Sequence, residues 1–137
     1  MRTSPNRLLA TIFGAVYLLV GLLGFAVTSG IGFAANSGGL LLGIFMVNPL
    51  HNVAHLLIGA ALLIAGVTTV RAAKTVNTVV GAAYLLLGIV GFFVSGPFNV
   101  LALNVPDHFL HLASAIVLLG VGLAADKSVR SATPQHA

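Results

Sequence analysis

The stretch GAVYLLVGLLGF, residues 14–25, decides the fold because it recurs as GAAYLLLGIVGF at residues 81–92, 67 positions later. Eight of the twelve positions are identical, and none of the four differences changes the apolar character of the segment. An internal repeat of this kind indicates that one structural unit occurs twice in the chain.

A second match follows each of these segments at a different offset. Six residues recur 56 positions later: Asn48, His55, Leu56, Leu62, Leu63 and Gly66 correspond to Asn104, His111, Leu112, Leu118, Leu119 and Gly122. The change of offset means that the loop between the two matches is 11 residues longer in the first repeat. We therefore assign repeat one to about residues 7–70, repeat two to about 74–127 and a tail to 128–137, all within a single membrane domain, residues 1–137.

The composition places this domain in a membrane. Of the 137 residues, 58% are hydrophobic and only 6% are charged, whereas soluble domains carry about 25% charged residues. Four stretches without Lys or Arg are long enough to cross the hydrocarbon layer: about residues 8–27, 50–70, 76–95 and 107–125. Because backbone groups in lipid must pair internally, we predict helices, and the expected fold class is all-α, a four-helix transmembrane bundle.

Each repeat contains a span, an outer loop and a second span, so that both repeats start on the same side. This predicts two tandem same-orientation helical hairpins with pseudo-two-fold symmetry along the membrane normal. The basic residues all flank the spans: Arg2, Arg7, Arg71, Lys74, Lys127 and Arg130. The positive-inside rule then puts both termini in the cytoplasm and the long loops, 28–49 and 96–106, outside. The same scattered placement argues against nucleic-acid binding, despite the net charge of +4.

Small residues recur seven positions apart on the spans, as in Gly14 and Gly21 or Gly81 and Gly88. Such faces let helices approach closely in lipid, and we expect them to pack the bundle, with oligomer contact as the alternative. The first outer loop is apolar, and flexible loops in water are usually polar. We expect it to fold back over the bundle or to form a short interfacial helix.

Four histidines fall at the predicted starts of spans two and four. His51 and His55 are four residues apart and share a helix face, as do Asp107 and His111, while His108 precedes His111 by three residues. A proline precedes each group, which suits the first turn of a helix. If spans two and four are neighbours, the imidazoles and the carboxylate converge near the outer face of the membrane.

This set of side chains predicts a metal site made of His51, His55, Asp107, His108 and His111. Imidazole and carboxylate groups suit Zn²⁺, Cu²⁺ or Fe²⁺, and the absence of cysteine excludes thiolate sites. Haem is the second choice, because it needs a wide slot that close-packed glycine faces do not leave. The competing interpretation is structural: Asp107 caps its helix, and neutral histidines hydrogen-bond the outer loops.

Five further residues lie where they could support that site: Asn48, Asn52, Asn104, Tyr17 and Tyr84. The asparagines adjoin the histidines and are natural hydrogen-bond partners for them. The two tyrosines are paired by the repeat and lie mid-span, where each phenol needs a partner. We expect a backbone partner for each phenol, with His55 or His111 as the alternative.

The segment Asn48-Pro49-Leu50-His51-Asn52-Val53-Ala54-His55-Leu56 resembles an uncharacterised family of small bacterial four-span membrane proteins, known as a domain of unknown function. The resemblance covers about residues 7–125 and rests mainly on the N-x-x-H-N-x-x-H-L stretch. The second repeat departs from this pattern, with Asp107 in place of the first histidine. Membership implies four spans in the bacterial inner (cytoplasmic) membrane and carries no activity with it.

Two functions follow as hypotheses. The first is a non-enzymatic membrane protein that holds a metal ion, or as a second choice haem, near the extracytoplasmic face. The alternative is a structural or accessory subunit of a larger membrane complex or homo-oligomer, with the histidines as internal fasteners. A transporter is disfavoured because four close-packed helices leave little lumen. An enzyme is disfavoured because Asp107, the candidate base, would serve as a ligand.

Overall fold

The computed structural model describes residues 3–127, so the predicted tail, 128–137, and the basic residues Arg2 and Arg130 lie outside the described part. Four long helices dominate, joined by short 3-10 turns and one small hairpin. In chain order the elements are α1 (Pro5–Gly24), η1 (Phe25–Val27), β1 (Gly39–Leu41), β2 (Phe45–Val47), α2 (Pro49–Thr68), α3 (Val70–Gly91), η2 (Gly96–Phe98) and α4 (Val105–Ala124).

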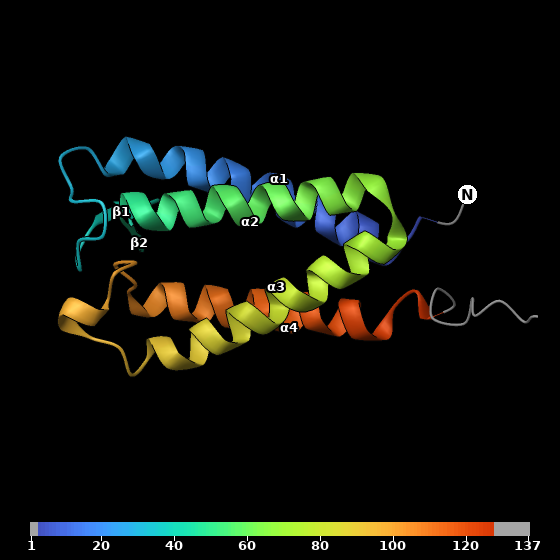
Figure 1. Cartoon of the computed structure of the whole chain (residues 1–137). Coiled ribbons are helices and arrows are strands. Elements are labelled where there is room, and N and C mark those ends of the chain that lie inside the picture. The colour runs from blue at the N-terminus through green and yellow to red at the C-terminus, as the bar shows by residue number, and fades with distance from the viewer. Residues whose placement is uncertain (1–2, 128–137) are drawn as a thin grey trace, which may run out of the picture.

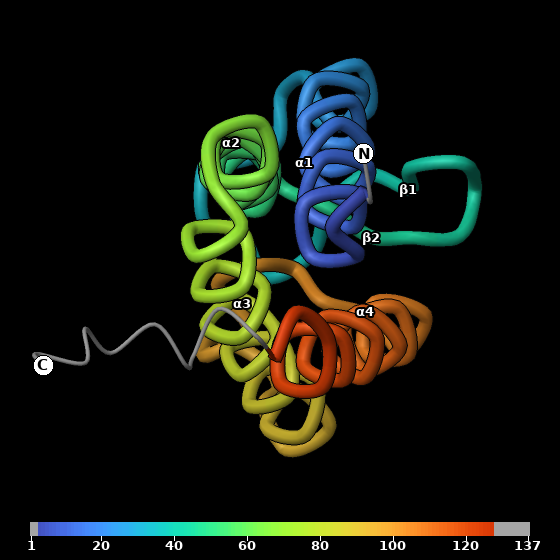
Figure 2. Tube along the Cα trace, turned by 90° about the vertical axis from the view of Figure 1, so that its right-hand side faces the viewer, coloured from blue at the N-terminus to red at the C-terminus, as the bar shows by residue number. Residues whose placement is uncertain are grey.

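All four helices are long and apolar enough to cross a membrane, which confirms the predicted fold class. Figure 1 shows α1 and α2 as one antiparallel hairpin and α3 and α4 as a second, lying beside it in the same direction. Viewed along the bundle, α2 and α4 lie diagonally opposite each other, while α3 contacts both α2 and α1 (Figure 2). We call the end with the hairpin β1–β2 the loop end, and the end where α1 begins and α4 ends the terminal end.

Each helix begins at a residue that satisfies its free amide groups. The side chains of Ser4, Asn48, Thr69 and Asn104 each accept a hydrogen bond from a backbone amide three residues later, as N-caps do. α2 and α3 are separated only by Thr69, which has an extended backbone. The third helix therefore starts at Val70 and includes Arg71 and Lys74, which precede the predicted span 76–95, because a helix can continue past the hydrocarbon boundary that hydropathy marks.

The first outer loop contains a β-hairpin instead of the interfacial helix that was one of our two expectations. β1 and β2 pair antiparallel, with Leu41 opposite Phe45. Leu42 and Gly43 have φ values of 55° and 71°, the left-handed geometry that tight hairpin turns require. Each strand is only three residues long, which is too short to produce a recognisable periodicity, so neither strand was predicted.

Glycines hold the two helices of each hairpin in backbone contact. A Cβ on Gly14 of α1 would come within 2.8 Å of the Gly59 carbonyl oxygen on α2. In the second hairpin a Cβ on Gly81 would come within 2.8 Å of the Leu119 amide on α4. Gly14 corresponds to Gly81 in the repeat, so the duplication extends to the packing. The expectation that these glycine faces pack the bundle is confirmed, since close approach is what small residues allow in lipid.

The interior is layered by polarity between the two ends. Tyr17 and Tyr84 stack on each other across the bundle axis, with ring centroids 5.4 Å apart. Toward the terminal end, Leu62 and Leu118, both fully buried, form an apolar layer with the alanines of α1 and α3. Since each leucine lies two turns after a histidine of the same helix, this layer separates the loop end from the polar groups beyond it.

A buried amide cluster joins three helices at the terminal end. The Asn77 side chain on α3 donates to the side-chain oxygen of Asn6 on α1 (3.1 Å). Asn6 in turn donates to the Asp126 carboxylate after α4 (2.8 Å), and Ser4 donates to the same oxygen (2.8 Å). Sequence reasoning missed this cluster because Asn6 and Asn77 are not equivalent positions in the repeat. It ties the two hairpins together where their glycine contacts do not reach.

Replacing Gly59 by Ala is expected to destabilise the protein by about 1–3 kcal/mol, because the new methyl group meets the backbone of Leu18 on α1. Gly120 provides the matched control, since a Cβ there meets nothing within 4 Å. Gly120→Ala is expected to be neutral or slightly stabilising. Thermal or chemical unfolding in detergent would compare the two, and equal stabilities would contradict the packing described.

Stability is also expected to fall with pH at the terminal end. Burial raises the pKa of the Asp126 carboxyl, but hydrogen bonds from Asn6 and Ser4 and the nearby charge of Lys74 outweigh it, so the pKa lies below its usual range. A carboxyl with a lowered folded-state pKa stabilises the fold above about pH 4 and loses that contribution as the pH falls further. Unfolding measured between neutral pH and about pH 3 should therefore show a smaller acid-induced loss for Asp126→Asn.

Candidate metal centre

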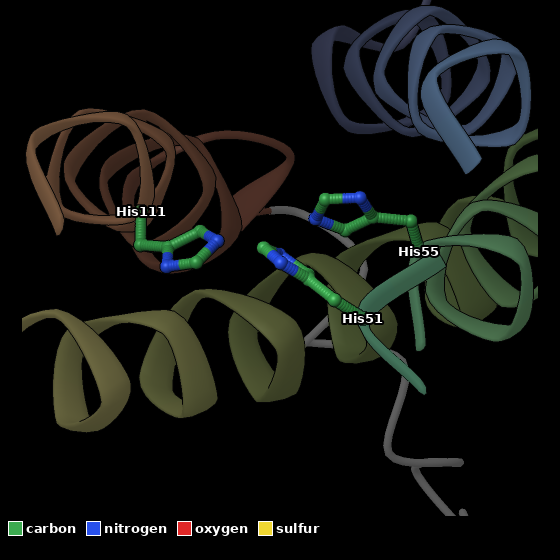
Figure 3. A group of neighbouring side chains, drawn as sticks. All are labelled: His51, His55 and His111. Atoms are coloured by element: carbon green, nitrogen blue, oxygen red, sulfur yellow. The ribbon is translucent and has the colours of Figure 1, made fainter. Parts of the chain in front are cut away.

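Three histidines from two helices meet inside the loop end of the bundle. His51 and His55 come from α2, and His111 comes from α4; each offers one ring nitrogen, and these three atoms lie within 4.8 Å of one another. Figure 3 shows the His111 ring reaching from α4 toward the two rings of α2. The ring centroids of His55 and His111 are 6.3 Å apart, so these equivalent residues of the two repeats face each other across the axis.

The helix starts explain why the rings converge. Asn48 caps α2 through the His51 amide (2.8 Å), which fixes His51 in the first turn. His55 lies one turn further on the same face, and the centroids of these two rings are 4.3 Å apart. α2 and α4 lie diagonally in the bundle, so their inward faces meet at the axis without direct helix packing (Figure 2).

The three imidazoles are almost completely buried, with 2% (His51), 3% (His55) and 1% (His111) of their surface exposed. Neither ring nitrogen of His51 or His55, nor Nδ1 of His111, has a hydrogen-bond partner of acceptable geometry. Backbone groups of Met46 and Leu101 lie near the His51 ring and are the nearest candidates for one. Buried polar atoms are normally paired, so this group of unpaired nitrogens needs an explanation.

Tyr17 and Tyr84 form the floor beneath the histidines. Tyr84 stacks on His111 with ring centroids 5.0 Å apart and an angle of 12°, and Tyr17 packs against His55 at 5.3 Å. The Tyr17 hydroxyl pairs with the Ser114 hydroxyl of α4 (2.7 Å), neither the backbone nor the imidazole partner that we expected. The Tyr84 hydroxyl has no partner. The tyrosines therefore support the imidazoles by ring contact.

Two of the predicted ligands take other positions. The Asp107 carboxylate accepts the Asn104 amide (2.8 Å) in a capping box at the start of α4, which was the structural role considered for it. His108 packs on Phe92, with ring centroids 4.7 Å apart, beside Gly91. Neither belongs to the group of three that the structure brings together. Their participation in metal binding stays a prediction.

Asparagines fasten the outer loops. Asn48 donates to the carbonyl oxygens of Ala35 (2.8 Å) and Val100 (2.7 Å), one in each loop. Asn104 donates to the Ile44 carbonyl oxygen (2.8 Å) in the hairpin turn. Asn52 donates to the Thr28 hydroxyl (3.1 Å) at the end of the first span. The His51 ring also lies near backbone groups of both loops, so the interpretation of the histidines as fasteners stays a hypothesis beside the metal site.

Ser114 is a site residue that sequence reasoning missed. It is buried and supplies the hydroxyl that pairs with Tyr17. Its equivalent in the first repeat is Ile58, so the comparison of the two repeats held a signal in the form of a polar residue replacing an apolar one.

Comparison with known proteins gave one match. The model of a family described as Domain of unknown function (DUF4383) matches residues 7–124, nearly the whole of both repeats. The resemblance inferred from the segment Asn48–Leu56 is thereby confirmed. No curated protein and no solved structure matched the chain.

The division of roles between asparagines and histidines can be tested by hydrogen exchange. Asn48→Ala should cost about 1–3 kcal/mol, because a helix cap and two buried hydrogen bonds are lost. Mass spectrometry should show faster amide exchange in both loops, around Ala35 and Val100. His55→Ala should leave these loops protected, and equal opening in the two variants would restore the fastener interpretation.

Proposed function

Because the chain belongs to the DUF4383 family, whose function is unknown, we propose a role from its own geometry: it is a small membrane protein that binds a divalent transition metal ion through His51, His55 and His111. We place this site near the extracytoplasmic face of the bacterial inner membrane, with both termini in the cytoplasm. The described basic residues Arg7, Arg71, Lys74 and Lys127 all lie toward the terminal end, in support of that orientation.

The observation that carries the proposal is the set of buried ring nitrogens without partners. Leaving a buried polar atom unpaired costs about 1–3 kcal/mol, and five such atoms occur in these three rings. A metal ion would be bound by one nitrogen of each ring. Three of the five unpaired nitrogens would then have a partner, and their free-energy cost would be removed. The second nitrogen of a ligating histidine commonly donates to a backbone carbonyl, and the backbone groups near His51 suit that role.

The dimensions of the cluster suit an ion of this kind. Around a tetrahedral Zn²⁺ with bonds of about 2.0–2.1 Å, two ligand nitrogens are roughly 3.4 Å apart. The three nitrogens here lie within 4.8 Å of one another, so modest ring rotations would bring them to bonding distance. Zn²⁺, Cu²⁺ and Fe²⁺ all accept imidazole, and the geometry does not choose among them. Haem is less well supported, because aromatic rings and glycine contacts fill the surrounding space.

One acidic residue is available to offset the charge of the ion. The chain has two acidic residues, and Asp107 is the one at the loop end. It lies in the first turn of α4, one turn before His111, where it caps the helix. We propose that Asp107 lowers the cost of a buried cation from this position and that the protein holds the ion without catalysing a reaction. The alternative is an accessory subunit of a larger membrane complex or homo-oligomer, in which the histidines serve as internal fasteners.

Metal analysis of the purified protein tests the proposal. We expect about one Zn²⁺, Cu²⁺ or Fe²⁺ per chain after exposure to each metal and desalting, measured by elemental analysis. His55→Ala and His111→Ala should each remove most of the bound ion, because two imidazoles alone form a weak site. Binding should also release protons and raise the thermal stability of the wild-type protein.

His108→Ala is the matched control, since His108 lies on the same helix as His111 but outside the cluster. It should retain the ion. Protein that binds no metal in any condition, or binding that survives the double variant His55→Ala/His111→Ala, would overturn the proposal.

A further inference from the structure

A cavity opens on one flank of the bundle, between α1 and α4. It has a volume of about 390 Å³, within the range of small-molecule sites. Ile12 and Val16 of α1 lie at its edge and are half exposed, so the cavity is reached from the side of the bundle. In a membrane this side faces lipid, and any occupant would come from the bilayer.

Two departures from the internal repeat create this cavity. On α4, Ala113 and Ser114 stand where α2 has Leu57 and Ile58, so two large side chains are replaced by small ones. The hairpin β1–β2, which belongs to the longer first loop, has no counterpart in the second repeat. Its residue Phe45 lines the cavity, and Figure 2 shows the hairpin on the flank where α1 faces α4. The two helices on the opposite flank, α2 and α3, have neither feature.

The cavity is apolar except at its inner wall. Tyr17 and Ser114 lie there with their hydroxyls paired, and one proton of that pair is free to donate. His55 also lines the wall, is 3% exposed, and has two unpaired ring nitrogens, one able to donate and one able to accept. The polar groups of the wall therefore match an oxygen-bearing head that both accepts and donates hydrogen bonds.

We propose that this cavity binds a neutral, membrane-soluble molecule with a ring head that carries carbonyl or hydroxyl oxygens, the chemistry of a quinone or quinol. The ring would pack among Phe13, Tyr17 and Phe45, and its oxygen would meet His55 and the Tyr17–Ser114 pair. The apolar tail would leave between α1 and α4. This site goes beyond the proposed metal centre and shares His55, Tyr17 and Asp107 with it.

Charge decides between this head and the heads of ordinary lipids. Among the described residues that line the cavity there is no Lys or Arg, so a phosphate or carboxylate would enter without a counterion. Burying such an unpaired charge in an apolar site is costly. The lining includes one acidic residue, Asp107, which already caps α4 and which further disfavours an anion. A neutral ring meets no such cost, and the aromatic side chains favour it.

Tyrosine fluorescence gives a direct test, because the chain has no tryptophan and its two tyrosines both lie at this wall or beside it. Full-length protein in nanodiscs would be titrated with a benzoquinone that carries a decyl tail. We expect saturable quenching, with one quinone bound per chain. Ala113→Leu, which restores the side chain of the other flank, should weaken binding roughly ten-fold or more by filling the cavity.

Leu57→Ala is the matched control, since it makes the reverse change at the equivalent position on α2 and should leave binding unchanged. Both variants would first be checked for wild-type melting temperature and monodispersity. Quenching that rises linearly without saturation, or that is equal in wild type and Ala113→Leu, would overturn the proposal. Displacement of the quinone by a fatty acid or an alkylammonium at equal concentration would overturn the assignment of a neutral head.

The same titration on chelator-treated protein separates this site from the metal centre. Saturable quenching is expected to persist there, because no metal is needed for the contacts described. Protein that binds no metal before chelation but still binds the quinone would count against the metal centre alone. Protein that holds one metal ion per chain before chelation, but shows no saturable quenching with or without chelator, would count against this cavity alone.

Discussion

Backbone contact at glycines is the constraint on which the rest of the molecule depends. Gly14 and Gly59 bring α1 and α2 so close that neither helix can rotate without a clash, and Gly81 does the same for the second hairpin. In lipid no hydrophobic force draws helices together, so this contact supplies the packing that fixes their orientation. Once the rotation is fixed, the first turns of α2 and α4 have to present His55 and His111 to the axis.

The protein has an apolar exterior, and its polar side chains lie inside the bundle, near the loop end and the terminal end. The polar side chains have different roles at these two levels. Asn48 and Asn104 secure the loops, Asn6 and Asn77 join the hairpins, and the histidines are left without partners. Other residues already fasten the loops and join the hairpins, so the five buried ring nitrogens without a hydrogen bond still require an explanation.

Much of the fold and part of the site could be predicted from the sequence, because comparing the two repeats shows which residues recur at equivalent positions. The repeat of residues 14–25 predicted the hairpins, and the spacing of His51 and His55 predicted that these two share a helix face. That His111 would meet them followed from the expectation that spans two and four are neighbours. Spacing alone could not separate these three from His108, since a difference of three or four residues is equally compatible with one face, and the choice depends on the rotation of α4. The hairpin β1–β2 was missed because it occurs in the first repeat alone. The Asn6–Asn77 pair was missed because each asparagine has an alanine, Ala73 or Ala10, at the equivalent position of the other repeat.

The layer of Leu62 and Leu118 has a consequence for traffic across the membrane. The side chains of this layer offer no oxygen or nitrogen atom to replace the water around an ion, so the layer opposes the passage of a charged species from the imidazoles to the amide cluster at the other end. An ion or molecule bound at the histidines would then exchange at the loop end or through the flank between α1 and α4.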